Sequence, residues 1–304
     1  MFAPVEEIQT TVFARVPDTL RRGEPRPAWY DERPFAPTHS FLEGPAFDRA
    51  GNLYCVDIPY GRIFRVSPQG AFDIVAEYDG QPNGLRIHRD GRFFIADRVY
   101  GLMVMEPGGH PPRPVFEQGV IDCFAGLNDL TFASNGDLYF TDQGEAGLEN
   151  PVGSLYCLRH NGRLDRLLSD LPGPNGLALN ADETVLYLNL SRTNTVWTVP
   201  FTRDGKPRRV SVFIQLSGST GGPDGLAVDA EGNLAIAHSG LGTVWLFSRL
   251  GEPMARIRSC EGLRTTNLAY GGADGKSLYI TESQNGAILQ ARLPVAGRRL
   301  FSHD

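Results

Sequence analysis

Near-copies of Gly173-Pro174-Asn175-Gly176-Leu177-Ala178 recur along this 304-residue chain. Each copy places an oxygen-bearing side chain in front of a short apolar run, and we call these six places the key positions. They lie 40, 45, 47, 49 and 43 residues apart, a period typical of repeat proteins in which each copy is one supersecondary unit. The key positions are Glu43, Asn83, Asn128, Asn175, Asp224 and Asn267.

The residues after each key position predict the structure of the unit. In the first copy a turn at Asp48–Asn52 is followed by the β-prone runs Leu53–Asp57 and Arg62–Val66, and the other copies repeat this order. Short β-branched and aromatic runs separated by Asn-Gly, Asp-Gly and Gly-Asn are hairpin signals. We therefore predict an all-β fold, a six-bladed β-propeller of four-stranded antiparallel blades.

Composition limits the classes of protein to which the chain can belong. The share of hydrophobic residues, 41%, is ordinary for a soluble globular protein. A net charge of -6 disfavours a nucleic-acid binder, and the longest apolar runs are too short to span a membrane. Residues 1–7 lack signal-peptide features, and the four cysteines show no zinc-type spacing. We expect a cytoplasmic, reduced protein, with no prediction of its oligomeric state.

The two ends of the chain complete the predicted ring. We expect residues 1–40 to form an N-terminal arm and residues 41–304 to form one propeller domain. The run Thr10–Val16 is predicted to be a strand that closes the last blade, since open sheet edges are a liability; the alternative is that Arg298–Phe301 does so. Residues 21–30 are rich in Pro and Arg and are expected to form an extended surface arm.

The topology of a propeller predicts where the functional site lies. The first strand of each blade is the innermost, so all six key positions converge on one mouth of the central channel. The loops between second and third strands surround the same mouth. They contain Tyr60, Arg98, Tyr100, residues 143–153, 189–194, 238–242 and 284–285.

Four of the key positions form a candidate metal site. Glu43, Asn128, Asn175 and Asp224 offer only carboxylate and amide oxygens, the hard donors that suit calcium or magnesium. A single Asn-Gly or Asp-Gly pair is more often an ordinary turn. Six such motifs in register, with two acids near the axis, favour the interpretation that these side chains are ligands. Asn83 and Asn267 are as suited to capping backbone groups as to contacting a metal or substrate.

These motifs, Glu43-Gly44-Pro45, Asn128-Asp129, Pro174–Leu177 and Pro223–Leu226, resemble those of the gluconolactonase and senescence-marker-protein (regucalcin-like) family. The resemblance covers residues 41–293 and extends more distantly to diisopropyl fluorophosphatases and paraoxonases. It implies a six-bladed propeller that hydrolyses lactones with one divalent metal. It also implies that Glu43, Asn175 and Asp224 are metal ligands and that Asn128 is a further ligand or a substrate contact.

The expected reaction is water attack on a metal-polarised lactone carbonyl. Asp224 is the expected general base, with Asp129 as the second candidate or as a residue that orients Asn128. Calcium is the expected ion, with magnesium, manganese and zinc as alternatives. The expected substrate contacts are Asn128, Tyr60, Arg98, Tyr100 and His238.

One position departs from the family pattern. Gly126 stands where many sugar lactonases of the family have an arginine, so a less polar lactone or ester is favoured over an aldonolactone. Two other functions remain open, a phosphotriesterase of the fluorophosphatase type and a non-catalytic propeller that serves as a binding platform.

Overall fold

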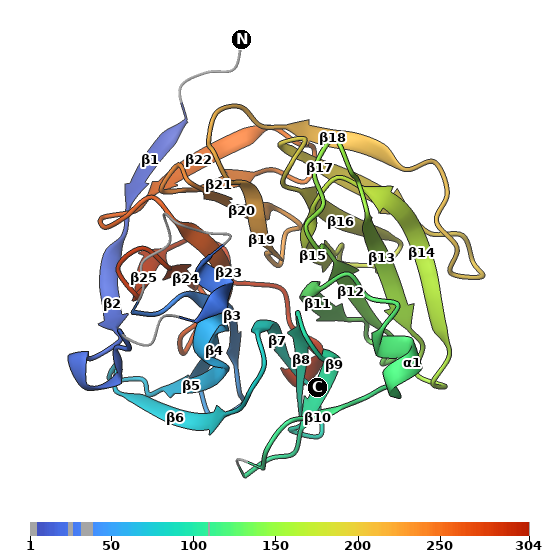
Figure 1. The fold of residues 1–304 in the computed structure, drawn as a ribbon. Helices are drawn as coiled ribbons and strands as arrows, with labels where there is room; N and C mark the ends of the chain where they lie inside the picture. The colour runs from blue at the N-terminus through green and yellow to red at the C-terminus, as the bar shows by residue number, and fades with distance from the viewer. Residues whose placement is uncertain (1–4, 24–26, 32–38, 109, 304) are drawn as a thin grey trace.

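Six antiparallel sheets are arranged around a central axis in the computed structural model, which describes residues 5–23, 27–31, 39–108 and 110–303 (Figure 1). The prediction of a six-bladed β-propeller is confirmed. Blade one comprises β3 (Leu42–Phe47), β4 (Leu53–Asp57), β5 (Arg62–Val66) and β6 (Phe72–Glu77); blade two comprises β7 (Pro82–Ile87), β8 (Phe93–Asp97), β9 (Gly101–Met105) and β10 (Arg113–Pro114); blade three comprises β11 (Leu127–Phe132), β12 (Leu138–Asp142), β13 (Gly153–Leu158) and β14 (Leu164–Leu171).

The other three blades follow in chain order. Blade four comprises β15 (Pro174–Leu179), β16 (Val185–Leu190), β17 (Thr195–Pro200) and β18 (Ser211–Gln215); blade five comprises β19 (Gly222–Val228), β20 (Leu234–Ser239), β21 (Thr243–Phe247) and β22 (Pro253–Arg258); blade six comprises β23 (Thr265–Gly271), β24 (Ser277–Glu282) and β25 (Ala287–Arg292).

The first hairpin of blade one shows why these residues form a blade. The Asp48 carboxylate accepts a hydrogen bond from the Asn52 N–H at 2.9 Å, and Gly51 adopts a φ of +82° that side chains other than glycine's disfavour. The turn therefore reverses the chain between β3 and β4. Apolar side chains of both strands then pack against the neighbouring blades, so the core lies between blades.

The N-terminal segment joins two blades. β2 (Thr11–Arg15) pairs antiparallel with β25 and is the fourth strand of blade six, whereas residues 298–300 form no strand. β1 (Glu6–Gln9) pairs in parallel with β22 and adds a fifth strand to blade five. The ring is thus closed by the first described strands of the chain.

The expectation of an extended surface arm at residues 21–30 is wrong for Trp29 and Tyr30. Both lie in the three-ten helix η2 (Ala28–Tyr30) and are buried against Ile58 and Phe41. Their ring centroids are 5.0 Å apart, so aromatic packing holds this turn on blade one. Residues 24–26 of that arm lie outside the described part of the chain.

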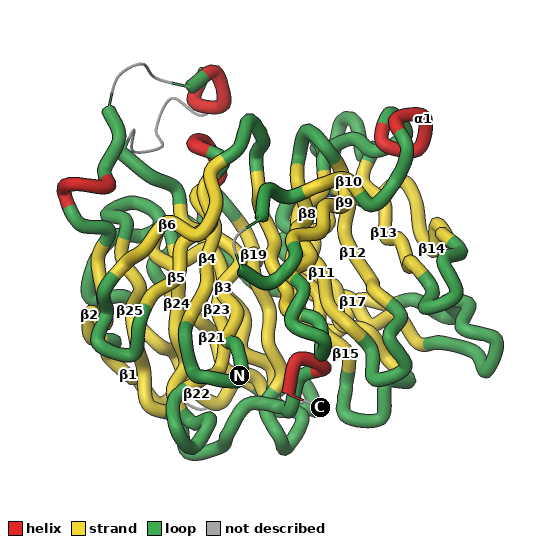
Figure 2. Tube along the Cα trace, turned by 90° about the horizontal axis from the view of Figure 1, so that it is seen from below, coloured by secondary structure: helices red, strands yellow, loops and turns green. Residues whose placement is uncertain are grey.

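The propeller has two faces, at the top and the bottom of Figure 2, and we call the ends of its central channel on these faces the upper and the lower mouth. The upper mouth carries α1 (Gln118–Ile121) and η3 (Ile58–Tyr60), and the lower mouth carries η4 (Phe301–His303) near the C-terminus. The remaining three-ten helix is η1 (Asp18–Leu20). None of the described helices is long and apolar enough to cross a membrane.

Candidate active site

Each key position lies where its inner strand loses regular pairing. In blades one to five the key residue is the second or third residue of the inner strand, and the pairing of this strand with its neighbour in the blade shifts register there. In blade six the register shift ends at Asn267. A bulge of this kind re-aims a side chain. Repeated in all six blades, it directs the key side chains towards the axis near the upper mouth.

Close contact between inner strands brings these residues together. Gly176 follows Asn175, and a Cβ at Gly176 would stand 2.3 Å from the Asp224 carbonyl oxygen. Gly84 has the same relation to Asn128, whose carbonyl oxygen would be 2.7 Å from a Cβ there. The glycine after a key residue thus lets the next blade approach, as the recurring Asn-Gly pairs require.

Three carboxylates act on one another electrostatically in the channel below the upper mouth. They belong to Glu43 of β3, Asp129 of β11 and Asp224 of β19. Burial, and after it the nearby carboxylates of Asp224 and Asp129, raise the pKa of Glu43 well above its usual value. Burial and Asp129 raise the pKa of Asp224 to about 7. The group is therefore electrostatically strained without a cation.

Two amides complete an all-oxygen donor set. The Asn175 Nδ2 donates to the Ser191 Oγ at 3.2 Å, while its buried Oδ1 has no hydrogen-bond partner. The Asn128 Nδ2 donates to the Gln143 Oε1 at 3.1 Å. The Asn175 amide also hydrogen-bonds the Asp224 carboxylate, so its nitrogen is satisfied and its Oδ1 is the atom left without a partner.

These residues fit a divalent cation. An unpartnered buried carbonyl oxygen costs free energy. The buried Glu43 carboxylate and the partly buried Asp224 carboxylate, whose pKa values are both raised, repel each other when ionised. A hard cation between them would relieve both. The described residues contain no cluster of three or more His, Cys, Asp or Glu side chains placed to hold a metal ion, so the donor set depends on the asparagines.

Asp129 is held by hydrogen bonds at both of its carboxylate oxygens. Its Oδ1 accepts from the Leu130 N–H at 2.8 Å and its Oδ2 from the Asn267 Nδ2 at 3.2 Å. The Arg86 Nη2 lies 3.7 Å from the same Oδ1. Asn267, whose own Oδ1 caps the Leu268 N–H at 2.8 Å, therefore positions Asp129. Asn83 is buried in β7 beside Gly44.

Sequence reasoning missed the part played by Arg86. It is the one charged residue in β7, an inner strand that is otherwise apolar or small except at its key position. A charged residue in an otherwise apolar inner strand was the feature of the sequence that could have identified Arg86. Arg192 lies two residues after the end of β16. It lowers the pKa of Asp224 and donates to the Ala146 carbonyl at 3.2 Å, so a guanidinium group lies near the predicted base.

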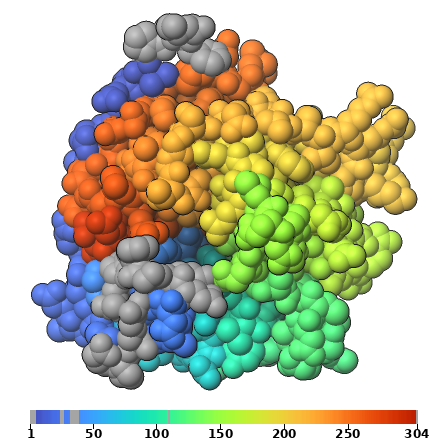
Figure 3. Space-filling view, turned by 45° about the horizontal axis from the view of Figure 1, so that its top comes forward, coloured from blue at the N-terminus to red at the C-terminus, as the bar shows by residue number. Residues whose placement is uncertain are grey.

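The predicted rim residues lie around the upper mouth. Arg98 forms an ion pair with Glu145 of the long loop after β12, and Tyr100 is anchored by its N–H on the Asp97 carboxylate at 2.8 Å. Tyr60 packs on the Trp29 and Tyr30 cluster. The space-filling view shows the surface hollowed near the axis, between the orange and red residues of the last blades and the green residues of blade three (Figure 3).

His238 lies inside blade five. It is fully buried, and its Nδ1 accepts from the Trp245 Nε1 at 3.2 Å. Burial, with a smaller effect of Arg256, lowers its pKa to about 4, so the imidazole is neutral. The structure brings His238 against Trp245 rather than against the central acids, and its role in substrate binding stays a prediction.

A second set of buried acids has a structural role. Asp97, Asp142 and Glu282 end second strands and accept hydrogen bonds from backbone N–H groups of the adjoining loops. Asp57 accepts from the Phe41 N–H at 2.7 Å and pairs with the fully buried Arg62. They fix loops at the upper mouth, both those that lead into the key positions and those between second and third strands.

Comparison with known proteins identifies the family of the chain. The sequence profile described as the SMP-30/Gluconolactonase/LRE-like region matches residues 41–284. A lactonase drp35 from Staphylococcus aureus is 28% identical over 229 residues, 71% of this chain and 69% of that protein. Two structures share the fold: a calcium-binding regucalcin from Agrobacterium tumefaciens (TM-score 0.79, 24% identity, 98% of each chain) and a gluconolactonase from Xanthomonas campestris (TM-score 0.72, 21% identity, 97% of this chain and 99% of that one).

Proposed function

Because the chain belongs to the SMP-30/gluconolactonase/LRE-like family, we propose that it hydrolyses a lactone with the help of one divalent cation. Glu43, Asn128, Asn175 and Asp224 are the residues that would hold the ion, and their oxygen donors favour calcium over magnesium, manganese or zinc. The observation that carries this proposal is the buried, unpartnered Asn175 Oδ1 beside two desolvated carboxylates.

When bound, such a cation polarises the lactone carbonyl. Asp224 takes a proton from water as the water oxygen attacks the carbonyl carbon. It returns that proton to the ring oxygen when the carbon–oxygen bond opens, and a hydroxy acid is released. Asn128, with its amide nitrogen fixed by Gln143, presents its carbonyl oxygen to the ion or to the substrate.

Asp224 is a better base than Asp129 in this arrangement. Burial raises its pKa to about 7 in the cation-free site, and a bound cation would lower that pKa, so the Asp224 carboxylate would be ionised and able to accept a proton at neutral pH. Both oxygens of Asp129 already accept hydrogen bonds. We therefore propose that Asp129 shapes the charge of the site and that Asp224 moves the proton.

The substrate is proposed to be a lactone of low polarity. The backbone at Gly126 has a φ of +140°, and a Cβ there would lie 3.5 Å from Gly144. An arginine at this position is disfavoured by the backbone itself, so the family's sugar contact cannot simply be restored. Tyr60 and Tyr100 offer apolar contacts, and Arg98 and Arg192 are the cations at the mouth.

A panel of aldonolactones and of aliphatic and aromatic lactones tests the proposal. Chelator-treated protein is assayed before and after each divalent ion is added back. Activity should return with the ion and fall at least about a hundredfold in Asp224→Asn, the usual scale for loss of a general base. The control is Asp274→Asn, the same change at an exposed carboxylate that pairs with Arg292.

Each alternative function predicts a different result. Cation binding with no turnover of any lactone would contradict the proposal and favour a phosphotriester substrate, which the same cation could serve. Absence of cation binding would favour a binding platform. The free cysteines Cys55, Cys123, Cys157 and Cys260 are consistent with the proposed reducing, cytoplasmic compartment.

A further inference from the structure

The lower mouth holds a cavity of about 780 Å³, at the opposite end of the channel from the key positions. It is lined by the far ends of the inner strands, by the first hairpins of several blades and by residues 296–301. None of its walls is a proposed ligand, base or substrate contact of the lactonase site, although Arg86 pairs with Asp129 there.

Six equivalent residues form the floor of this cavity, and we call them the lower ring. They stand three residues after the key position in blades one to five and two residues after it in blade six. Five are small, so the channel stays open below them, and the remaining one is an arginine. The lower ring consists of Ala46, Arg86, Thr131, Ala178, Ala227 and Ala269.

Arg86 keeps hydrogen-bond donors for a ligand. Its side chain is 13% exposed. Its Nη1 donates to the carbonyls of Leu85 at 2.8 Å and Pro45 at 3.5 Å. Its Nη2 lies 3.7 Å from the Asp129 Oδ1, beyond hydrogen-bond distance. A guanidinium carries five N–H groups, so Nε and Nη2 retain donors.

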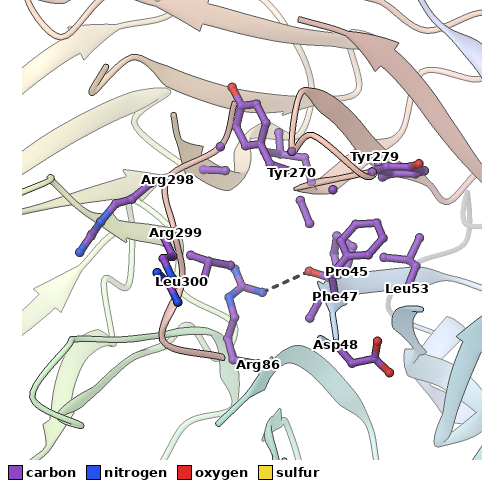
Figure 4. Close-up of a pocket in the computed structure, with 18 of the residues that line it drawn as sticks. Pro45, Phe47, Asp48, Leu53, Arg86, Tyr270, Tyr279, Arg298, Arg299 and Leu300 are labelled. Carbon is purple, nitrogen blue, oxygen red and sulfur yellow. Dashed lines mark hydrogen bonds between the residues drawn. The ribbon is translucent and has the colours of Figure 1, made fainter. Parts of the chain in front are cut away.

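The walls around Arg86 are mostly apolar and aromatic. Figure 4 shows its side chain extending into the space surrounded by Phe47, Tyr270 and Leu300, with Arg299 on the same side as Leu300. Such walls suit hydrocarbon or an aromatic ring. The positive charge of Arg86 at the floor, with that of Arg299 nearby, favours an anionic end on the ligand.

The C-terminal segment makes this wall a fixed part of the molecule. The Arg298 N–H donates to the Val228 carbonyl at 2.9 Å, and its side chain pairs with Glu183 at 2.5 Å. The Phe301 ring stacks on Phe132 with centroids 5.2 Å apart. Contacts to blades three, four and five therefore shape the cavity before a ligand arrives.

We propose that the lower cavity is a second binding site, which takes an amphipathic monocarboxylate. The carboxylate accepts hydrogen bonds from Arg86, and the apolar body lies against Phe47, Tyr270 and Leu300. A single anionic charge is specified because the Asp129 carboxylate faces the same guanidinium, so a doubly charged phosphate would be repelled. This site opens at the mouth opposite to lactone hydrolysis, and Arg86 adjoins both sites because it pairs with Asp129.

Titration calorimetry with 4-phenylbutanoate and its neutral amide, 4-phenylbutanamide, tests the proposal on the cation-loaded protein. The wild type should bind the carboxylate at least about tenfold more tightly than the amide, as expected of charge-assisted hydrogen bonds. Arg86→Met should remove this preference, and Arg86→Lys should keep most of it. Ala227→Phe, which fills the cavity from a partly exposed position of the lower ring, should weaken both probes.

Asn175→Ala separates this site from the upper mouth, where a carboxylate could bind the cation. Binding that persists in Asn175→Ala and after chelation, and that loses its carboxylate preference in Arg86→Met, supports the lower site. Binding that disappears in Asn175→Ala and is unchanged in Arg86→Met places the probe at the upper mouth and overturns the proposal. So does a wild-type protein that binds neither probe.

Discussion

Asn175 shows how one side chain can reveal a missing partner. Its amide nitrogen is held by Ser191, and its carbonyl oxygen is buried without a hydrogen bond. A protein interior rarely leaves such an atom unpaired, and the two acids beside it, Glu43 and Asp224, lack a counter-charge of matching size. A divalent cation satisfies all three.

Replacing Asn175 by alanine should therefore weaken cation binding. Loss of one carbonyl ligand should raise the dissociation constant at least about tenfold, which is ~1.4 kcal/mol. Calorimetric titration of calcium into chelator-treated protein measures the change. Asn161→Ala, at an exposed turn, is the matched control, and an equal loss of affinity in both variants would contradict the assignment.

The pH dependence of stability should reverse when the cation is removed. The pKa of Asp224 rises on folding from its usual value of 3.8 to about 7, and that of Glu43 rises as well. The metal-free folded state therefore binds more protons than the unfolded chain. The stability that this proton binding contributes is fully present below about pH 4 and is lost as the pH rises to about 7.

Thermal unfolding of chelator-treated protein between pH 5 and pH 8 measures this effect. The melting temperature should fall with pH in the wild type, fall less in Asp224→Asn, and recover at pH 8 when calcium is added. A wild-type profile parallel to that of Asp224→Asn would show that Asp224 does not carry the effect.

The role of a residue could be predicted where the same kind of residue recurs at equivalent positions of the six copies, and not where one copy differs from the others. Glu43, Asn128, Asn175 and Asp224 were found because six copies align. Arg86 escaped notice because its meaning depends on the five small residues at equivalent places in other blades. His238 follows the same rule, since the pattern predicts its strand but not the Trp245 indole that it faces.

Each inner strand must pair regularly with the second strand of its own blade and must also approach the inner strand of the next blade closely at the axis. The register shift at each key position meets both, because it turns one side chain towards the channel while the rest of the strand stays paired. The glycine that follows leaves room for the neighbouring strand. Position and period of the strands were predictable, whereas the bulges depend on backbone geometry that the pattern does not specify.

Gly176→Ala should disturb this arrangement. Its new Cβ would meet the Asp224 carbonyl oxygen at 2.3 Å, so the two strands must separate, at a cost of about 1–3 kcal/mol in the free energy of unfolding. Cation affinity should fall too, since Asp224 moves. Denaturant titration and calorimetry measure both effects.

Gly119→Ala is the matched control for that change. Gly119 lies in α1, and no atom stands within 4 Å of the place that an alanine methyl group would take, so alanine should be neutral or slightly stabilising there. If Gly176→Ala is as harmless as Gly119→Ala, close strand approach does not organise the site.

The ring as a whole depends on its closure by β2. Val16 directly follows this strand and is 1% exposed, and its N–H donates to the Gly286 carbonyl at 2.9 Å. The Phe13 and Tyr279 rings meet edge to face at 5.0 Å. The two ends of the sequence thus share one blade, an arrangement that the missing outer strand after residue 293 already indicated.

Val16→Ala should lower the free energy of unfolding by about 2 kcal/mol, because it removes buried methyl groups at the closure. Val212→Ala, on the outer strand β18 where the side chain is 55% exposed, should change it by less than about 0.5 kcal/mol. Chemical denaturation compares the two. Equal effects would mean that closure at the N-terminal segment contributes little.

The central claim, one divalent cation between the inner strands, is tested most directly by anomalous diffraction from crystals soaked in manganese. We expect a peak near the upper mouth, within coordination distance of oxygens of Glu43, Asn175 and Asp224. A channel without a peak, at a manganese concentration that supports lactone hydrolysis, would contradict the claim, as would an ion bound only elsewhere.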